Sequence, residues 1–201
     1  MVYVVTQIFF IEVTIKMKLC ICETFENITN NIMKSMSNID YGWVDIDGNI
    51  HNGDDFDSFY LDYILQSPEQ VLANNIGVCW DQVELERLMF EQHNIPHKTF
   101  FIEYNDGDGK PSHTFLLYYD DGKCYWFEHS WYDFKGIHVY ENEEEALSDI
   151  KDKFIAHTED ELETECDLDL FYLYEYNKPE YGINCDDFYT FCETTGKEIY
   201  S

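Results

Sequence analysis

The hydrophobic pattern of this 201-residue chain changes its period at Pro96, and this change constrains the fold more than any other feature. Before it, residues 79–92 place apolar side chains at helical spacing on several faces, which predicts a helix buried between layers. After it, residues 98–104, 113–119 and 123–131 are rich in aromatic and β-branched side chains and predict successive strands. We therefore expect an α+β fold whose helices pack on a mainly antiparallel sheet.

Local signals predict the remaining elements. Ser67 is predicted to be a helix N-cap because Pro68 follows it and Gln70 stands where a capping box needs a glutamine. Helices are expected over residues 23–37, 67–75, 141–155 and 184–197. Strands are expected over residues 136–140 and 168–176, and a small hairpin over 41–51.

Length and charge narrow the possible partners. A chain of 201 residues favours a single domain over residues 1–201, and its 45% hydrophobic content is enough to bury a core. The formal net charge of −29 repels phosphate backbones, so nucleic acid is excluded as a partner, whereas basic partners or cationic substrates are compatible. The apolar stretch 1–15 is interrupted by Gln7 and Glu12 and is too short to span a membrane. We expect it to be a strand, or upstream read-through before a natural start at Met17.

The cysteines form no regular framework. They are seven in number, Cys20, Cys22, Cys79, Cys124, Cys166, Cys185 and Cys192. An odd, irregular set favours reduced thiols and a cytoplasmic location. Cys20 and Cys22 have no matching pair for zinc, and the aspartate-rich loops 45–49 and 105–109 lack the closing glutamate of a calcium loop. No metal or cofactor is expected.

One thiol has a distinctive setting. Cys79 follows Gly77 at the predicted start of a helix, where free N–H groups and the helix dipole favour a thiolate. A small buried cysteine capping a core helix is the competing interpretation. His113 lies 34 residues downstream, and Glu128 lies 15 residues further on the next strand. A nucleophilic cysteine needs such a base and a group to orient it, so the three residues form a candidate catalytic triad.

The turn between the last two strands decides whether Glu128 can reach His113. A two-residue turn places His113 opposite Ser130 and leaves Glu128 diagonal on the same face, and another register puts the two directly opposite. A three-residue turn instead places His113 opposite His129 and turns Glu128 away. Because an imidazole needs an acceptor for its second N–H, we predict that Glu128 shares the His113 face and is hydrogen-bonded to that ring.

Four motifs in this order resemble the transglutaminase-like superfamily of cysteine hydrolases and acyltransferases. They are "GVCW" at 77–80, "NIPHKTFFIE" at 94–103, "SHTFLLYY" at 112–119 and "YWFEHSW" at 125–131. The resemblance covers about residues 65–135 and leaves 1–64 and 136–201 as flanking elaborations. Papain-type enzymes share the chemistry but separate the cysteine and histidine by more chain. The family usually has aspartate followed by proline at the third position, whereas this chain has Glu128 without the proline.

The resemblance implies a transglutaminase-like, papain-like core and a cysteine-dependent hydrolase or acyltransferase that acts on a protein or peptide amide. In that reading Cys79 attacks, His113 transfers the proton and Glu128 orients the imidazole. The alternative is a non-catalytic domain that keeps this fold and binds a partner through its acidic face. Neither reading sets the oligomeric state.

Other residues are expected to have supporting roles in the site or in the core. The backbone N–H of Cys79 is the expected first oxyanion donor, and the candidates for the second are Trp43, Tyr63 and Gln66. The other histidines are expected to be surface or structural: His51, His93, His97, His129, His138 and His157. Trp80 and Trp131 are expected to pack in the core.

Overall fold

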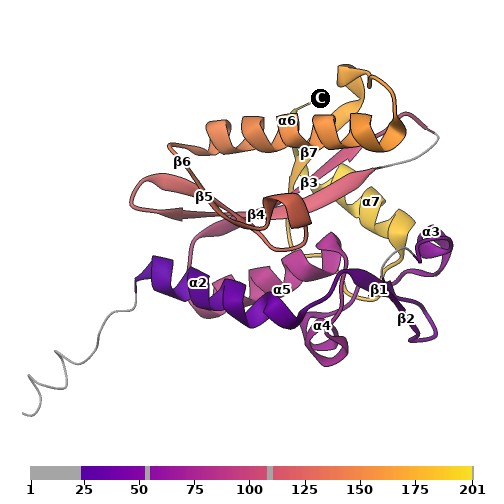
Figure 1. Cartoon of the computed structure of the whole chain (residues 1–201), viewed down its shortest axis with the longest axis horizontal. Coiled ribbons are helices and arrows are strands. Elements are labelled where there is room, and N and C mark those ends of the chain that lie inside the picture. The colour runs from indigo at the N-terminus through magenta and orange to yellow at the C-terminus, as the bar shows by residue number, and fades with distance from the viewer. Residues whose placement is uncertain (1–23, 53–54, 108–110, 201) are drawn as a thin grey trace, which may run out of the picture.

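The computed structural model describes residues 24–52, 55–107 and 111–200 (Figure 1). Its centre is a six-stranded sheet in the order β6-β5-β4-β3-β7-β8, in which every neighbouring pair is antiparallel. The strands are β3 (His97–Tyr104), β4 (Ser112–Asp120), β5 (Lys123–Glu128), β6 (Gly136–Tyr140), β7 (Phe171–Tyr176) and β8 (Lys197–Tyr200). The predicted α+β class with a mainly antiparallel sheet is confirmed.

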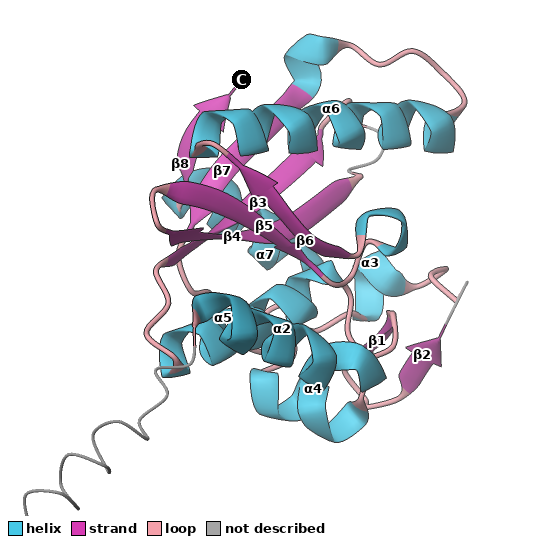
Figure 2. Cartoon of the chain, turned by 60° about the vertical axis from the view of Figure 1, so that its left-hand side comes forward, coloured by secondary structure: helices cyan, strands magenta, loops and turns pink. Residues whose placement is uncertain are grey.

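Helices cover both faces of this sheet. They are α2 (Phe25–Ser35), α3 (Phe59–Asp62), α4 (Pro68–Asn74), α5 (Cys79–Gln92), α6 (Glu143–Leu162) and α7 (Cys185–Thr195). Figures 1 and 2 show α6 across one face and α2, α4 and α5 across the other. A separate hairpin, β1 (Gly42–Val44) with β2 (Ile50–Asn52), lies near α3 and α4 in both views.

Alternation along the strands divides the core. On β3, Phe100 and Ile102 are buried with the apolar stripe of α6, while Phe101 is buried with Trp80 on the α5 side. A strand sends successive side chains to opposite faces, so a continuous apolar run fits a sheet that is covered on both sides. The α6 stripe includes Ile150, which is fully buried, as the spacing of apolar residues in 141–155 predicts.

The helix α5 is buried between the sheet and the outer helices, as predicted, although several of its buried residues are charged. Glu84 forms an ion pair with Arg87 at 3.0 Å, and the hydroxyl of Tyr176 donates to Glu84 at 3.2 Å. Buried charges are tolerated when they are paired in this way.

Several boundaries differ from the predictions. The strand β5 ends at Glu128 instead of continuing to residue 131, because the Glu128 carboxylate accepts the backbone N–H of Trp131 and the chain turns. The helix α6 runs to Leu162, since its last turns are polar and give no apolar periodicity to read. The short helix α3 and the edge strand β8 were not predicted.

The aspartate-rich loop 45–49 is a hairpin turn and not a metal site. The side chain of Asp45 accepts the backbone N–H groups of Asp47 and Asn49 at 2.9 and 2.8 Å, so residues 45–49 form the predicted turn. Within the described ranges, no group of three or more His, Cys, Asp or Glu residues is placed to bind a metal ion, and no helix is long and apolar enough to cross a membrane. The predicted strand 1–15, Met17 and the Cys20–Cys22 pair lie outside the described residues, as does part of the loop 105–109.

Candidate active site

The start of α5 is fixed by a buried carboxylate. Oδ2 of Asp81 accepts the backbone N–H of Val78 at 3.0 Å, and Oδ1 accepts the hydroxyl of Tyr63 and the backbone N–H of Gln66, each at 2.8 Å. Burial raises the pKa of Asp81 to about 7, while these hydrogen bonds oppose the rise. The result is a rigid helix terminus with Cys79 as its first residue.

The turn at Asp121–Gly122 sets the strand register. Both residues have positive φ, 47° and 77°, which suits a two-residue hairpin turn, and Asp120 pairs with Lys123. His113 and Glu128 therefore lie on one face of the sheet, and Nε2 of His113 is 2.8 Å from Oε2 of Glu128. The predicted hydrogen bond is confirmed, and the register that places His129 beside His113 is wrong.

Glu128 is held on its other side as well. Its Oε1 accepts the hydroxyl of Ser130 at 3.0 Å and the backbone N–H of Trp131 at 2.7 Å. Burial alone would raise the pKa of Glu128, but the charge of His113 and these hydrogen bonds lower it. The carboxylate is thus ionised and oriented toward the imidazole.

His113 connects the carboxylate to the thiol. Because Nε2 is occupied by Glu128, Nδ1 is the ring nitrogen left for Cys79. Burial lowers the pKa of His113, but the charge of Glu128 and hydrogen bonding to Cys79 outweigh it and raise the pKa to about 10. The three predicted site residues are therefore brought together in the order thiol, imidazole, carboxylate.

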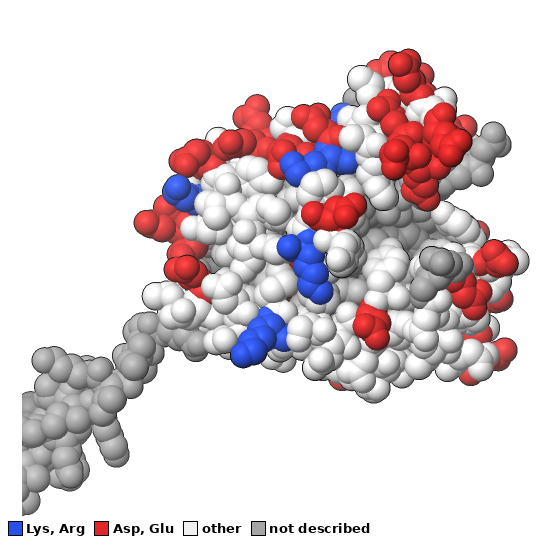
Figure 3. All heavy atoms as spheres, viewed as in Figure 1, with Lys and Arg blue, Asp and Glu red and all other residues white. Residues whose placement is uncertain are grey.

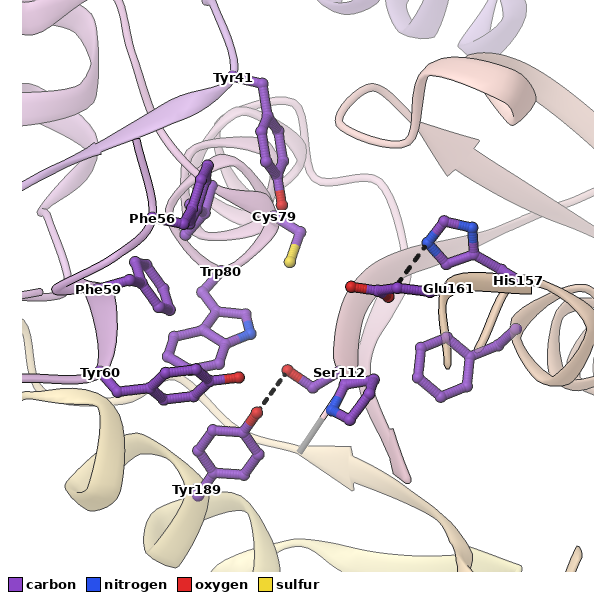
Figure 4. A pocket seen from close by; sticks show the side chains of 13 residues that line it. Tyr41, Phe56, Phe59, Tyr60, Cys79, Trp80, Ser112, His157, Glu161 and Tyr189 are labelled. Carbon is purple, nitrogen blue, oxygen red and sulfur yellow. Dashed lines mark hydrogen bonds and ion pairs between the residues drawn. The ribbon is translucent and has the colours of Figure 1, made fainter. Parts of the chain in front are cut away.

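The thiol opens onto a cavity of about 400 Å³ (Figure 4). A second cavity, of about 360 Å³, lies on the imidazole side and includes His113, Ser130 and Trp131 in its wall. Both cavities are lined by Tyr41, Ser112, Phe154 and His157. Cys79 and His113 are thus accessible from two adjoining cavities, one beside the sulfur and one beside the imidazole ring.

Tyr41 is a site residue that the sequence did not reveal. Figure 4 shows its hydroxyl pointing toward the sulfur of Cys79, although 47% of the residue surface is exposed. Burial of the hydroxyl, followed by its interactions with Cys79, raises the pKa of Tyr41 well above 10. A neutral hydroxyl is therefore available beside the thiol. Tyr41 precedes the β1–β2 hairpin, and no motif marks it in the sequence.

The three candidates for a second oxyanion donor are wrong. Nε1 of Trp43 donates to the carbonyl of Asp55 at 2.7 Å, and Tyr63 donates to Asp81. The side-chain amide of Gln66 donates to the carbonyl of Ile76 at 3.0 Å. All three hold the loops around α5 in place instead of facing the thiol.

His129 is structural, as predicted. Its ring lies between Gln82 and Lys135, with Nδ1 2.5 Å from Oε1 of Gln82 and Nε2 2.9 Å from Nζ of Lys135. Burial and the charge of Lys135 lower the pKa of His129 to about 4, so the ring is neutral.

Three other residues have a further role besides the expected one. His157 is half-exposed but lines both cavities, so it is more than a surface residue. Trp80 is buried in the core and also lines the cavity beside the sulfur, while Trp131 stands edge-on to His113 with 4.9 Å between ring centroids. The two tryptophans therefore form walls of the site as well as packing against the core.

Glu86 is a further buried acid on α5, about two helical turns beyond Cys79. Its pKa is raised well above its ordinary value by burial and then by the charge of Glu128. Helical spacing places it on the Cys79 side of the helix, but the sequence gives no sign of its burial.

No family model, curated protein or solved structure matches this chain.

Proposed function

We propose that this protein is a cysteine-dependent hydrolase or acyltransferase that acts on a protein or peptide amide. The observation that carries the proposal is the hydrogen bond of 2.8 Å between His113 and Glu128, together with Cys79 at a helix start, whose interaction raises the pKa of the same ring. This arrangement supplies a nucleophile, a base and an orienting carboxylate. We further propose that about residues 65–135 form a transglutaminase-like core, as the four sequence motifs suggest.

In the first step, Cys79 acts as a thiolate whose proton is already on Nδ1 of His113, because the pKa of about 10 keeps that ring an imidazolium. The sulfur then attacks the carbonyl carbon of the amide, and the C=O electrons move onto oxygen to give a tetrahedral oxyanion. The backbone N–H of Cys79 is one donor to this oxyanion, because the first N–H groups of a helix have no partner within it. The neutral hydroxyl of Tyr41 is our candidate for the second donor.

In the second step, the C–N bond breaks and the imidazolium gives its proton to the leaving amine. A thioester between the acyl group and Cys79 remains. Water or a second amine then attacks the thioester carbon, His113 takes the attacker's proton, and the sulfur leaves. Water gives hydrolysis and an amine gives acyl transfer.

Turnover of a peptide–amide library tests the proposal. The Cys79→Ala variant should lose all activity while its free energy of unfolding changes by only about 1 kcal/mol, because one sulfur is removed from a helix end. Cys185→Ala is the matched control, since Cys185 is also a buried first residue of a helix. Activity that survives in Cys79→Ala would refute the proposal.

The alternative proposal is a non-catalytic domain that binds a basic partner. The net charge of −29 favours it, and Figure 3 shows acidic side chains gathered over one end of α6. The five described cysteines are all free thiols, which supports our proposal of a reducing, cytoplasmic setting for either function. If no amide in the library is turned over by the wild-type protein, the binding function is favoured.

A further inference from the structure

The cavity beside the sulfur has an aromatic wall. Its lining includes Phe56, Phe59, Tyr60, Trp80 and Tyr189. Figure 4 shows these rings surrounding one side of the space into which the thiol points, with Tyr189 donating to Ser112 at 3.0 Å. Aromatic faces carry negative partial charge and attract cations as well as apolar groups.

The opposite side of this cavity carries an acid. Glu161, from the last turn of α6, is the one carboxylate among its lining residues, and those residues include neither lysine nor arginine. Oε2 of Glu161 lies 3.9 Å from Nε2 of His157, and both side chains line the cavity while about half of their surface is exposed, so the pair stands at the rim. Figure 3 shows further acidic side chains gathered over this end of α6. The potential at the rim is therefore negative.

The position of the cavity assigns it to one part of the substrate. It is lined by Val78, Cys79 and Trp80, whereas the second cavity is lined by His113, Ser130 and Trp131. In the proposed reaction the leaving amine must be near the imidazole, because the imidazole protonates it. The acyl portion of the substrate is then on the sulfur side, in the aromatic cavity.

Resting on the proposed function, we infer that this cavity binds an arginine or lysine side chain of the acyl portion, so that the protein acts on the amide that follows a basic residue. A guanidinium or ammonium group would lie against the aromatic faces and approach Glu161. A neutral aliphatic side chain would fit the wall but gain nothing from the carboxylate. An acidic side chain would be repelled by the rim.

Substrate-like covalent probes separate this inference from the proposed function. Peptidyl acyloxymethyl ketones that differ only in carrying arginine, norleucine or glutamate next to the ketone alkylate a reactive thiol. Mass spectrometry gives the rate of Cys79 modification, and iodoacetamide, which has no side chain to recognise, gives the reference rate for each variant. We expect the arginine probe to react on the order of tenfold faster than the norleucine probe, and the glutamate probe to be the slowest.

Two variants locate the selectivity. Glu161→Gln should lower the arginine-to-norleucine ratio by about two- to fivefold, because an exposed ion pair contributes little, and Tyr60→Leu should lower it by a similar factor through the lost aromatic face. Glu165→Gln is the matched control, since Glu165 is an exposed acid just beyond α6 that does not line the cavity. It should leave the ratio unchanged.

These measurements distinguish a failure of the inference from a failure of the proposed function. If iodoacetamide labels Cys79 rapidly but the arginine and norleucine probes react equally, the inference is wrong and the proposed function stands. A ratio that is unchanged in Glu161→Gln and Tyr60→Leu likewise overturns the inference. If neither iodoacetamide nor any ketone modifies Cys79, the proposed function and the inference both fail.

Discussion

Replacing Glu128 by glutamine should disable the site while preserving its shape. The two carboxylate oxygens face different donors: Oε2 faces Nε2 of His113 at 2.8 Å, and Oε1 accepts the backbone N–H of Trp131 at 2.7 Å and the hydroxyl of Ser130 at 3.0 Å. Glutamine has one oxygen and one NH₂ group. One of the two sides must therefore meet a donor where it now meets an acceptor.

The two orientations of that amide have different consequences. If its oxygen keeps the N–H of Trp131, its NH₂ group faces Nε2 of His113, and the ring proton must move to Nδ1. The nitrogen that faces Cys79 then cannot accept the thiol proton. The reverse orientation sets two buried donors against each other at Trp131, at a cost of about 1–3 kcal/mol. We expect the first, with a fall in turnover of about 10³- to 10⁴-fold.

The same substitution should change how stability depends on pH. Burial lowers the pKa of His113, but the charge of Glu128 is the largest contribution that raises it, and the result is about 10. A histidine whose folded pKa exceeds its unfolded value of about 6.5 contributes stability that is complete below that value and is lost as pH rises toward the folded pKa. Between pH 6 and 8.5 the wild-type protein should lose about 2 kcal/mol more than Glu128→Gln.

Turnover and urea unfolding at the two pH values check both expectations. Glu175→Gln is the control, because Glu175 also lies on a strand of the sheet and pairs with a cation, Lys98, at 3.2 Å. It should behave as the wild-type protein does. Wild-type turnover in Glu128→Gln, or an unchanged pH dependence of unfolding, would refute the assignment of Glu128 as the group that orients His113.

Three further predictions concern the groups around the thiol. Tyr41→Phe should lower turnover on the order of 10²-fold, because one oxyanion donor is lost, and an unchanged turnover in steady-state kinetics would exclude this role. Asp81→Asn should reduce the free energy of unfolding by about 1–3 kcal/mol, because an NH₂ group would face N–H and O–H donors at the start of α5. Calorimetry measures this change. The same variant should also slow the labelling of Cys79, which mass spectrometry measures. The wild-type protein should also lose stability as pH falls below about 4.5, because the lowered pKa of Glu128 stabilises the fold only while the carboxylate is ionised. Urea unfolding at pH 6 and pH 4 measures this loss. An equal loss of unfolding free energy in Glu128→Gln would contradict it.

Most of the helices and strands that position the site were predictable from local sequence signals. The capping pattern at Ser67 and Gln70 and the period change at Pro96 are local signals, and the structure has a capping box at Ser67 and begins β3 at His97. Chain order alone left the hairpin register open. The requirement for an acceptor beside His113 favoured the register that the structure shows.

What the sequence could not predict depends on contacts between distant segments. Tyr41 reaches Cys79 only because the chain before β1 folds back over the start of α5, where the carbonyl of Asp40 accepts the backbone N–H of Gly77. Glu161 lies on a polar stretch of α6 that has no apolar periodicity, so neither the continuation of the helix beyond residue 155 nor the place of Glu161 beside the cavity was predictable. Local propensity carries no information about such positions.

Thiol labelling with limiting iodoacetamide at pH 7 tests the central claim most directly. Cys79 is 4% exposed, whereas Cys166 is partly exposed, so exposure alone predicts that Cys166 is modified before Cys79. A thiol activated by His113 predicts the reverse order in the wild-type protein, and the loss of that advantage in His113→Ala. Modification of Cys166 ahead of Cys79 in the wild-type protein, or an equally fast Cys79 in His113→Ala, would contradict the proposed catalytic site.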